Sequence, residues 1–280
     1  MRVFVAGASG AIGTPLVRRL VAGGHEVTGM TRREERAERL RAGGAEAVVC
    51  DVYDAERLSE VVAAARPEAV VHLLTALPPK FSPRSDYLAA TNRVRTEGTR
   101  NLVAAARAAG AARLVAESVA FFYAAAGDRV KDEESPLAES APGNFGAALE
   151  AVKDLERQVR EAEGIDGLVL RFGWLYGPGT YYAGGGSQAE DTRKRRFPVV
   201  GAGSGVFSFV HVDDAAAATA AALECGAPGA YNVVDDEPAR VAEWLPALAR
   251  ELGAKPPMRV PRLVGRLFAG EAGVAMMTSV

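Results

Sequence analysis

Three glycines near the start of the chain, Gly7, Gly10 and Gly13, have a spacing that points to phosphate binding. An apolar run over residues 3–6 precedes them and is typical of a buried parallel strand, and leucine and valine recur at helical spacing over residues 16–21. A glycine turn between a strand and a helix presents backbone N–H groups and the helix N-terminus to a pyrophosphate. Gly7 permits the tight turn, Gly10 lets the phosphate approach, and Gly13 lets helix and strand pack closely. The predicted dinucleotide site consists of Gly7, Ser9, Gly10, Ala11, Ile12 and Gly13.

The end of a second expected strand, over residues 26–30, is followed by Thr31, Arg32 and Arg33. In a doubly wound sheet, an acidic residue here would bind the ribose 2′-hydroxyl and disfavour a 2′-phosphate, and the sequence has none. A guanidinium pairs with a phosphate and stacks on adenine. These residues therefore favour NADP(H) over NAD(H), although two glutamates directly after them weaken the basic patch. The alternative is that the two arginines only begin a solvated helix.

The Gly-x-x-Gly-x-x-Gly spacing resembles the short-chain dehydrogenase/reductase superfamily, particularly its extended and atypical branches, the epimerase/dehydratase-like proteins. Further segments are similar to family motifs: Asp51-Val52 after the third strand, the stretch from Val71 to Ala76, Asn92 with Gly98-Thr99, and Arg171 through Tyr176-Gly177-Pro178. The resemblance implies additional cofactor contacts from Asp51, Val52, Leu74, Thr75, Ala76, Asn92, Ser118, Arg171, Phe172, Gly173 and Trp174. Asn92 has two open interpretations, a proton-relay residue or simple helix packing. His72 lies inside an apolar strand and is predicted to be packed and not catalytic.

Typical members of this superfamily carry Tyr-x-x-x-Lys on one helix, where the tyrosine exchanges a proton with the substrate oxygen and the lysine lowers its pKa. None of the seven tyrosines of this chain has a lysine four residues later. By the resemblance, Phe145 and Leu149 stand where the pair belongs, and Val119 stands at the position of the family's Ser or Thr. The neighbouring Ser118 is the one remaining candidate for a catalytic residue.

Without the pair, oxidation of a plain alcohol has no base, whereas a ketone polarised by its own hydroxyls needs less from the protein. The apolar replacements and nearby aromatic residues suit a flat, apolar substrate. Tyr181 and Tyr182, beside three glycines, predict a mobile lid over residues 180–198. The expected substrate-lining residues are Val119, Phe121, Phe122, Phe145, Leu149, Trp174, Tyr181 and Tyr182.

The elements that position these residues alternate between strand and helix, which predicts an α/β fold with a doubly wound parallel Rossmann sheet and a small C-terminal substrate lobe with a lid. Helices are expected over residues 54–65, 86–109 and 144–163. The dinucleotide-binding domain is expected over residues 1–174, with 206–226 returning to it. Residues 175–205 and 227–280 are expected to form the lobe.

The composition excludes several classes of function. The chain has 280 residues and a formal net charge of −2, which gives no reason to expect nucleic acid or a membrane surface. The first residues form a core strand and not a signal peptide, and no apolar run could span a bilayer. Cys50 and Cys225 are far apart and lack metal-type spacing. We expect a cytoplasmic enzyme without a metal, either a monomer or a homodimer.

These observations favour an NADPH-dependent ketoreductase that acts on a polycyclic aromatic ketone, with protonation assisted by the substrate. The whole-chain pattern is similar to tailoring ketoreductases of aromatic, angucyclinone-type polyketide pathways, which implies a role in antibiotic biosynthesis. One alternative is a non-catalytic NADP(H)-binding redox sensor or regulator. Another is a nucleotide-sugar epimerase or dehydratase, although those reactions begin by deprotonating a sugar hydroxyl and the missing Tyr and Lys argue against them.

Overall fold

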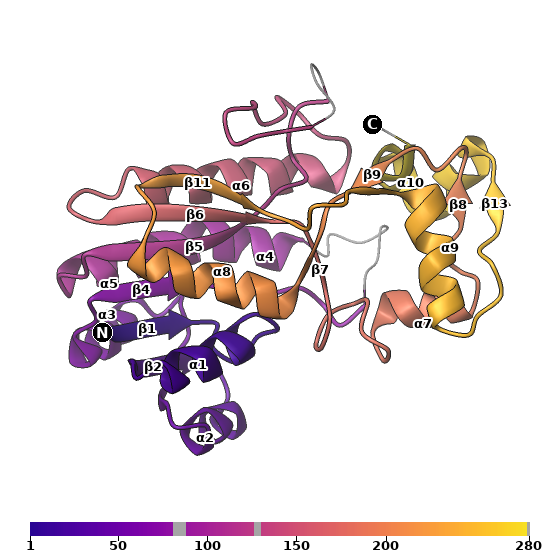
Figure 1. Ribbon diagram of the computed structural model, residues 1–280. Helices are drawn as coiled ribbons and strands as arrows, with labels where there is room; N and C mark the ends of the chain where they lie inside the picture. The colour runs from indigo at the N-terminus through magenta and orange to yellow at the C-terminus, as the bar shows by residue number, and fades with distance from the viewer. Residues whose placement is uncertain (81–87, 126–129, 279–280) are drawn as a thin grey trace.

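Seven parallel strands form one central sheet in the computed structural model, which describes residues 1–80, 88–125 and 130–278 (Figure 1). The strand order is β11-β6-β5-β4-β1-β2-β3, so the order reverses between β1 and β4. A cleft at the carboxyl ends of the strands is the usual ligand site of such a sheet. The predicted doubly wound Rossmann sheet is thereby confirmed. The strands are β1 (Arg2–Ala6), β2 (Glu26–Thr31), β3 (Glu46–Val49), β4 (Ala69–His72), β5 (Arg113–Val119), β6 (Asp166–Phe172) and β11 (Gly229–Val233).

Helices cover both faces of this sheet because each presents one apolar face to it (Figure 1). Leu16 and Leu20 of α1 pack with Ala215 of α8 on one face. Leu58 of α3 and Leu102 of α5 pack on the other. The flanking helices are α1 (Gly13–Ala22), α2 (Glu34–Ala42), α3 (Ala55–Ala65), α5 (Thr99–Ala108), α6 (Asn144–Arg160) and α8 (Val212–Glu224).

The helix expected over residues 86–109 has three parts in its described portion. It begins as α4 (Ala89–Arg93), continues as a π-helical turn, η1 (Val94–Gly98), and ends as α5. The beginning of the expected helix lies outside the described residues. A π turn adds one residue to a helical turn and changes the direction in which side chains point, and such turns frequently occur at functional sites.

A smaller lobe lies beyond the carboxyl ends of the strands (Figure 1). Its core contains Val199, Phe207, Leu245 and Met277, packed against Trp174 and Trp244. The pairing of β9 with β12 and of β8 with β13 joins distant parts of the chain within this lobe. The remaining elements are β7 (Trp174–Tyr176), α7 (Ser187–Arg193), β8 (Val199–Val200), β9 (Val206–Phe207), β10 (Phe209–His211), β12 (Ala239–Arg240), α9 (Val241–Glu251), β13 (Arg259–Val260) and α10 (Arg262–Thr278).

Candidate active site

A cleft of about 940 Å³ runs along the carboxyl ends of the strands and is bordered by the segment that leads into the lobe. The glycine turn and Arg32 line one end of it, and Phe121, Trp174 and Tyr181 line the other. Both the dinucleotide-binding turn and the aromatic residues predicted from the sequence therefore meet in one cavity. Its volume is of the order found for cofactor and substrate sites.

The glycine turn fits the phosphates of a dinucleotide. Gly7 has a φ of +92°, and a Cβ added there would lie 2.5 Å from the carbonyl oxygen of Leu73. A Cβ on Gly13 would collide with the carbonyl oxygen of Gly7. Only glycine meets both conditions, and the turn thereby directs the amino end of α1 into the cleft. Ser9, Gly10, Ala11, Ile12 and Gly13 all line the cleft at this point.

Arginines make the adjoining end of the cleft cationic. Arg32 and Arg33, directly after β2, line it together with Arg36. Glu34 forms an ion pair with Arg41, so its charge is neutralised away from the two arginines. Thr31 lies beside the turn, with its hydroxyl 3.3 Å from that of Ser9.

The other residues expected to contact a cofactor divide into two groups. Thr75 and Ala76 line the cleft, whereas Leu74, Asp51, Val52 and Asn92 do not. The carboxylate of Asp51 accepts a hydrogen bond from the backbone N–H of Tyr53. Asn92 has a buried Oδ1 without a hydrogen-bond partner among the described residues.

His72 is a structural residue, as its position in an apolar strand predicts. The backbone N–H of Leu74 donates to its Nδ1 at 3.2 Å, so its Nε2 carries the proton and donates to the hydroxyl of Thr99 at 2.9 Å. Burial lowers the pKa of His72 to about 4, and Arg95 contributes in the same direction. The imidazole is neutral at physiological pH.

Ser118 and Arg171 belong to a buried polar network behind the cleft. The Ser118 hydroxyl donates to Glu156 at 2.7 Å. Arg171 donates to the same carboxylate through Nε at 2.9 Å and Nη2 at 2.7 Å, and it also donates to the hydroxyl of Tyr123. Ser118 lines the cleft but its proton is engaged here, while Arg171 lies outside the lining. These side chains hold β5, β6 and α6 together.

The cleft wall at which the resemblance places the superfamily's tyrosine and lysine is apolar. Val119, Phe122 and Phe145 line the cleft, and Leu149 is fully buried behind them in the same cluster. Ala148, next to Leu149, also lines the cleft at this wall. This wall offers no proton to a bound substrate.

The lid residues provide the two tyrosine hydroxyls of the cleft lining. Tyr181 donates to the backbone oxygen of Pro78 at 2.6 Å, which joins the segment expected to form a lid to the loop after β4. Tyr182 packs edge-on against Phe209 and Trp244 in the lobe. Burial raises the pKa of both tyrosines, so both remain protonated at neutral pH.

A column of aromatic rings forms the substrate end. Phe121 and Trp174 are stacked with centroids 4.5 Å apart, and Trp174 stacks on Phe207 at 5.0 Å. Phe172 and Gly173, which precede Trp174, also line the cleft. Parallel aromatic surfaces of this kind bind flat, conjugated ligands.

Among the lining residues that were not predicted from the sequence, Arg95 and Glu117 are both charged and buried. Arg95 comes from η1 and Glu117 from β5. A signal existed for each. The family pattern Asn-x-x-Gly-Thr places its asparagine three residues before Gly98, which is Arg95 and not Asn92. Glu117 is a charged residue that directly follows the apolar run Leu114–Ala116 of its strand.

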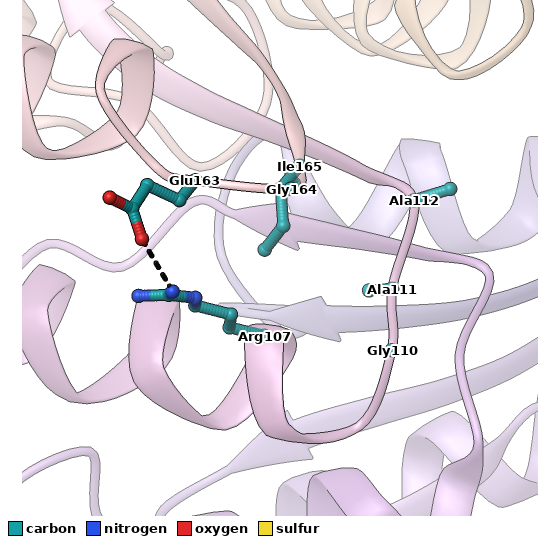
Figure 2. A pocket seen from close by; sticks show the side chains of 7 residues that line it. All are labelled: Arg107, Gly110, Ala111, Ala112, Glu163, Gly164 and Ile165. Carbon is teal, nitrogen blue, oxygen red and sulfur yellow. Dashed lines mark hydrogen bonds and ion pairs between the residues drawn. The ribbon is translucent and has the colours of Figure 1, made fainter.

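A second, shallow pocket of about 600 Å³ lies at the opposite, amino end of β5, between the end of α5 and the loop before β6 (Figure 2). Its two charged residues, Arg107 and Glu163, pair with each other at 2.7 Å. The rest of its lining consists of glycine, alanine and isoleucine. This pocket presents no group suited to catalysis.

Metal-binding clusters and membrane-spanning helices are both absent from the described residues. Within residues 1–80, 88–125 and 130–278, no cluster of three or more histidine, cysteine or carboxylate side chains could hold a metal ion. The same part of the chain contains no helix whose length and hydropathy would allow it to cross a membrane.

A comparison of the sequence with family profiles identifies the family of this chain. The profile of the NAD dependent epimerase/dehydratase family matches residues 3–233. The chain belongs to this family. It is therefore an NAD(P)-dependent oxidoreductase with a nicotinamide dinucleotide as its cofactor, and the fitted glycine turn agrees with that assignment.

Individual relatives and a solved structure extend the comparison. A 3-diazoavenalumate denitrifying reductase from a Streptomyces species is 50% identical over 271 residues, covering 96% of this chain and 88% of that protein. A 4-hydroxy-2-methyl-3-oxo-4-farnesyl-3,4-dihydroquinoline-1-oxide ketoreductase from Stigmatella aurantiaca is 27% identical over 91% of this chain and 74% of its own length. The crystal structure of the UDP-glucose 4-epimerase of Thermus thermophilus in complex with NAD matches 99% of this chain and 97% of that one, with a TM-score of 0.72 and 25% identity.

Proposed function

We propose that this protein reduces an aromatic carboxylic acid that carries a diazo group, which leaves as N₂. The cofactor supplies a hydride, and the net change replaces the diazo group on the ring by hydrogen. The observation that carries this proposal is the apolar wall of Val119, Phe122 and Phe145, because it contains no acid. An electrophilic aryl diazonium takes up a hydride and loses N₂ without receiving a proton from the protein.

The relative that is 50% identical supports the same acceptor, since its name specifies a diazo compound, a carboxylate and the loss of nitrogen. The stacked Phe121 and Trp174 suit the aromatic ring. In this reaction the residues of the chain bind and orient the acceptor and exclude water, and none of them needs to transfer a proton.

We further propose NADPH as the preferred reductant. Arg32, Arg33 and Arg36 line the cleft where the adenosine ribose would lie. The neighbouring Glu34 forms an ion pair with Arg41. A guanidinium in this place stabilises a 2′-phosphate.

A second candidate is reduction of a ketone on a polycyclic aromatic, polyketide-type substrate that supplies its own proton. The Stigmatella aurantiaca relative, named as a ketoreductase of an oxygenated ring system, favours it. The aromatic column fits such a substrate equally well, and the apolar wall again requires that the proton come from elsewhere.

One experiment distinguishes the two candidates. The protein is mixed with NADPH or NADH and a matched pair of aromatic acids, one with a diazo group and one with a ketone, and loss of reduced-nicotinamide absorbance is followed with release of N₂. We expect NADPH oxidation with one N₂ released for each NADPH consumed. Reduction of the ketone alone would replace the first candidate by the second, and oxidation of NADPH by neither would contradict both.

A further inference from the structure

Arg95 and Glu117 form an incomplete ion pair in the floor of the cleft. Each residue is 6% exposed, and both contribute to the cleft lining. Nη2 of Arg95 and Oε1 of Glu117 are 3.9 Å apart, which is too far for a hydrogen bond. Within the part of the chain that the structure describes, neither Nε of Arg95 nor Oε1 of Glu117 has a hydrogen-bond partner.

A second buried pair in the same protein shows what a completed arrangement looks like. Arg171 and Glu156 are similarly buried and share two hydrogen bonds, with Ser118 donating a third. Buried charges without such hydrogen bonds are strongly destabilising, because desolvation exceeds the attraction between the ions. The same burial raises the pKa of Glu117 and lowers that of Arg95, and each charge partly offsets the other. The Arg95–Glu117 pair thus lacks the hydrogen bonds that the Arg171–Glu156 pair has.

The backbone directs both side chains toward ligand space. Side chains alternate along a strand, so Glu117 lies on the same face of β5 as Val119, two residues nearer the start of the strand. Arg95 is carried by the π-helical turn η1, which packs against α6 behind the apolar wall. The pair therefore lies near the carboxyl end of β5 and lines the same cleft as the glycine turn and the aromatic residues.

We propose that Arg95 and Glu117 form a binding subsite for a hydroxyl group of a bound ligand. Arg95 donates a hydrogen bond to the hydroxyl oxygen, and the hydroxyl donates to Oε1 of Glu117. A neutral group that both accepts and donates a hydrogen bond gives each of the two side chains a partner. It does so without adding a net charge to a buried site. A carbonyl could only accept from Arg95, and an ammonium could only donate to Glu117, so either group would leave one side chain without a partner.

Two ligands carry such a group: the ribose next to the nicotinamide, and an aromatic substrate with a hydroxyl on its ring. The second source rests on the proposed function, and the first does not. Binding measurements separate them, and they require no turnover, so failure of the diazo reaction leaves this subsite open to test.

The test uses Glu117→Gln and the double variant E117Q/R95Q, which removes both charges together. Glu156→Gln, in the completed pair, serves as a control for damage to a buried ion pair. The dissociation constant of NADPH is measured by fluorescence titration. Those of para-hydroxybenzoate and benzoate are measured on the protein–NADP⁺ complex.

Loss of a hydrogen bond to a charged group lowers affinity by about tenfold or more. A weakening of that size in NADPH binding assigns the subsite to the ribose. Loss of the preference for para-hydroxybenzoate over benzoate, with NADPH binding unchanged, assigns it to the substrate. Glu156→Gln should lower the melting temperature without either effect. If the folded double variant binds NADPH and both acids like the unmodified protein, or if Glu156→Gln weakens binding equally, the proposal is wrong.

Discussion

Two hydroxyl groups that line the cleft are engaged in contacts within the protein. Ser118 donates its proton to Glu156, and Tyr181 donates to Pro78. Phe145 and Leu149, which the resemblance places at the superfamily's tyrosine and lysine positions, pack with Phe122 and Val119. At the level of single residues, this apolar wall can pack against an acceptor but carries no group that could protonate it.

Ser118 provides the first test of this interpretation. Because its hydroxyl stabilises a buried carboxylate, Ser118→Ala should lower the free energy of unfolding by about 1–2 kcal/mol. The value of kcat/KM should change by less than about threefold, whereas loss of a general acid typically costs about a hundredfold or more. Chemical denaturation and steady-state kinetics give the two numbers.

Ser135→Ala is a matched control, since Ser135 is a partly exposed serine that also donates to a carboxylate, that of Asp132 at 2.8 Å. It should leave both stability and rate unchanged. A hundredfold loss of kcat/KM in Ser118→Ala with intact stability would assign Ser118 a catalytic role.

His72 predicts a pH dependence of stability. Its pKa is lowered to about 4 in the folded protein by burial, so below its ordinary value near 6.5 the unfolded chain binds a proton that the folded chain does not. Folding stability should fall as the pH drops from 7.5 toward 4, and the contribution of His72 amounts to about 2 kcal/mol at pH 5.

His72→Gln retains a donor toward Thr99 and does not titrate. The difference in unfolding free energy between pH 7.5 and 5 should therefore be smaller in this variant by about 2 kcal/mol. If the unfolding free energy depends on pH equally in the two proteins, the folded state does not disfavour protonation of His72, and this prediction is wrong.

Among the elements, the segment between β7 and α7 borders the cleft, and the sequence predicts that it acts as a lid. Tyr181 fastens it to the loop after β4, and Gly179, Thr180 and Gly186 of the same segment also line the cleft. The hydrogen bond joins this segment to the loop after β4, so it stabilises the observed arrangement of the two.

Tyr181→Phe removes this hydrogen bond but keeps the ring. We expect KM for the aromatic substrate to rise about fivefold, as for the loss of about 1 kcal/mol, while kcat changes little. Tyr231→Phe is the matched control, because the Tyr231 hydroxyl donates to the carbonyl of Ala227 at 2.8 Å on the outer strand β11. A fall in kcat with unchanged KM would instead place the Tyr181 hydroxyl in the chemical step.

Local sequence patterns predicted the elements well because strands and helices here follow simple apolar periodicity. The expected helix over 144–163 is observed as α6 (Asn144–Arg160), and the first strand and glycine turn are found where expected. The π turn η1 was not predicted, since Val94–Gly98 has no residue that distinguishes it from an ordinary helix. Its consequence, Arg95 in the cleft, was missed with it.

Hydrogen bonds between residues far apart in the chain could not be predicted from local sequence patterns either. The apolar strand predicted that His72 is packed, but its partner Thr99 lies 27 residues away. Ser118 and Glu156 are separated by 38 residues, so the engagement of the serine hydroxyl became visible only in the folded protein. Apolar burial can be predicted locally, whereas the pairing of buried polar groups depends on how whole elements meet.

At the scale of the whole molecule, a sheet that fits a dinucleotide is joined to a lobe with its own core. The aromatic column crosses this junction, from Phe121 through Trp174 and Phe207 to Trp244. The cleft borders both parts, so a flat acceptor would lie against the column while the glycine turn holds the other end of the cofactor.

An isotope measurement tests most directly whether hydride transfer proceeds without a proton from the protein. The rate of diazo acid reduction is compared for ordinary NADPH and NADPH deuterated at the transferred position, each in H₂O and in D₂O. We expect the deuterated cofactor to slow the reaction and D₂O to leave the rate unchanged. A slowing in D₂O that multiplies with the cofactor effect would show a proton moving together with the hydride, and would contradict this account.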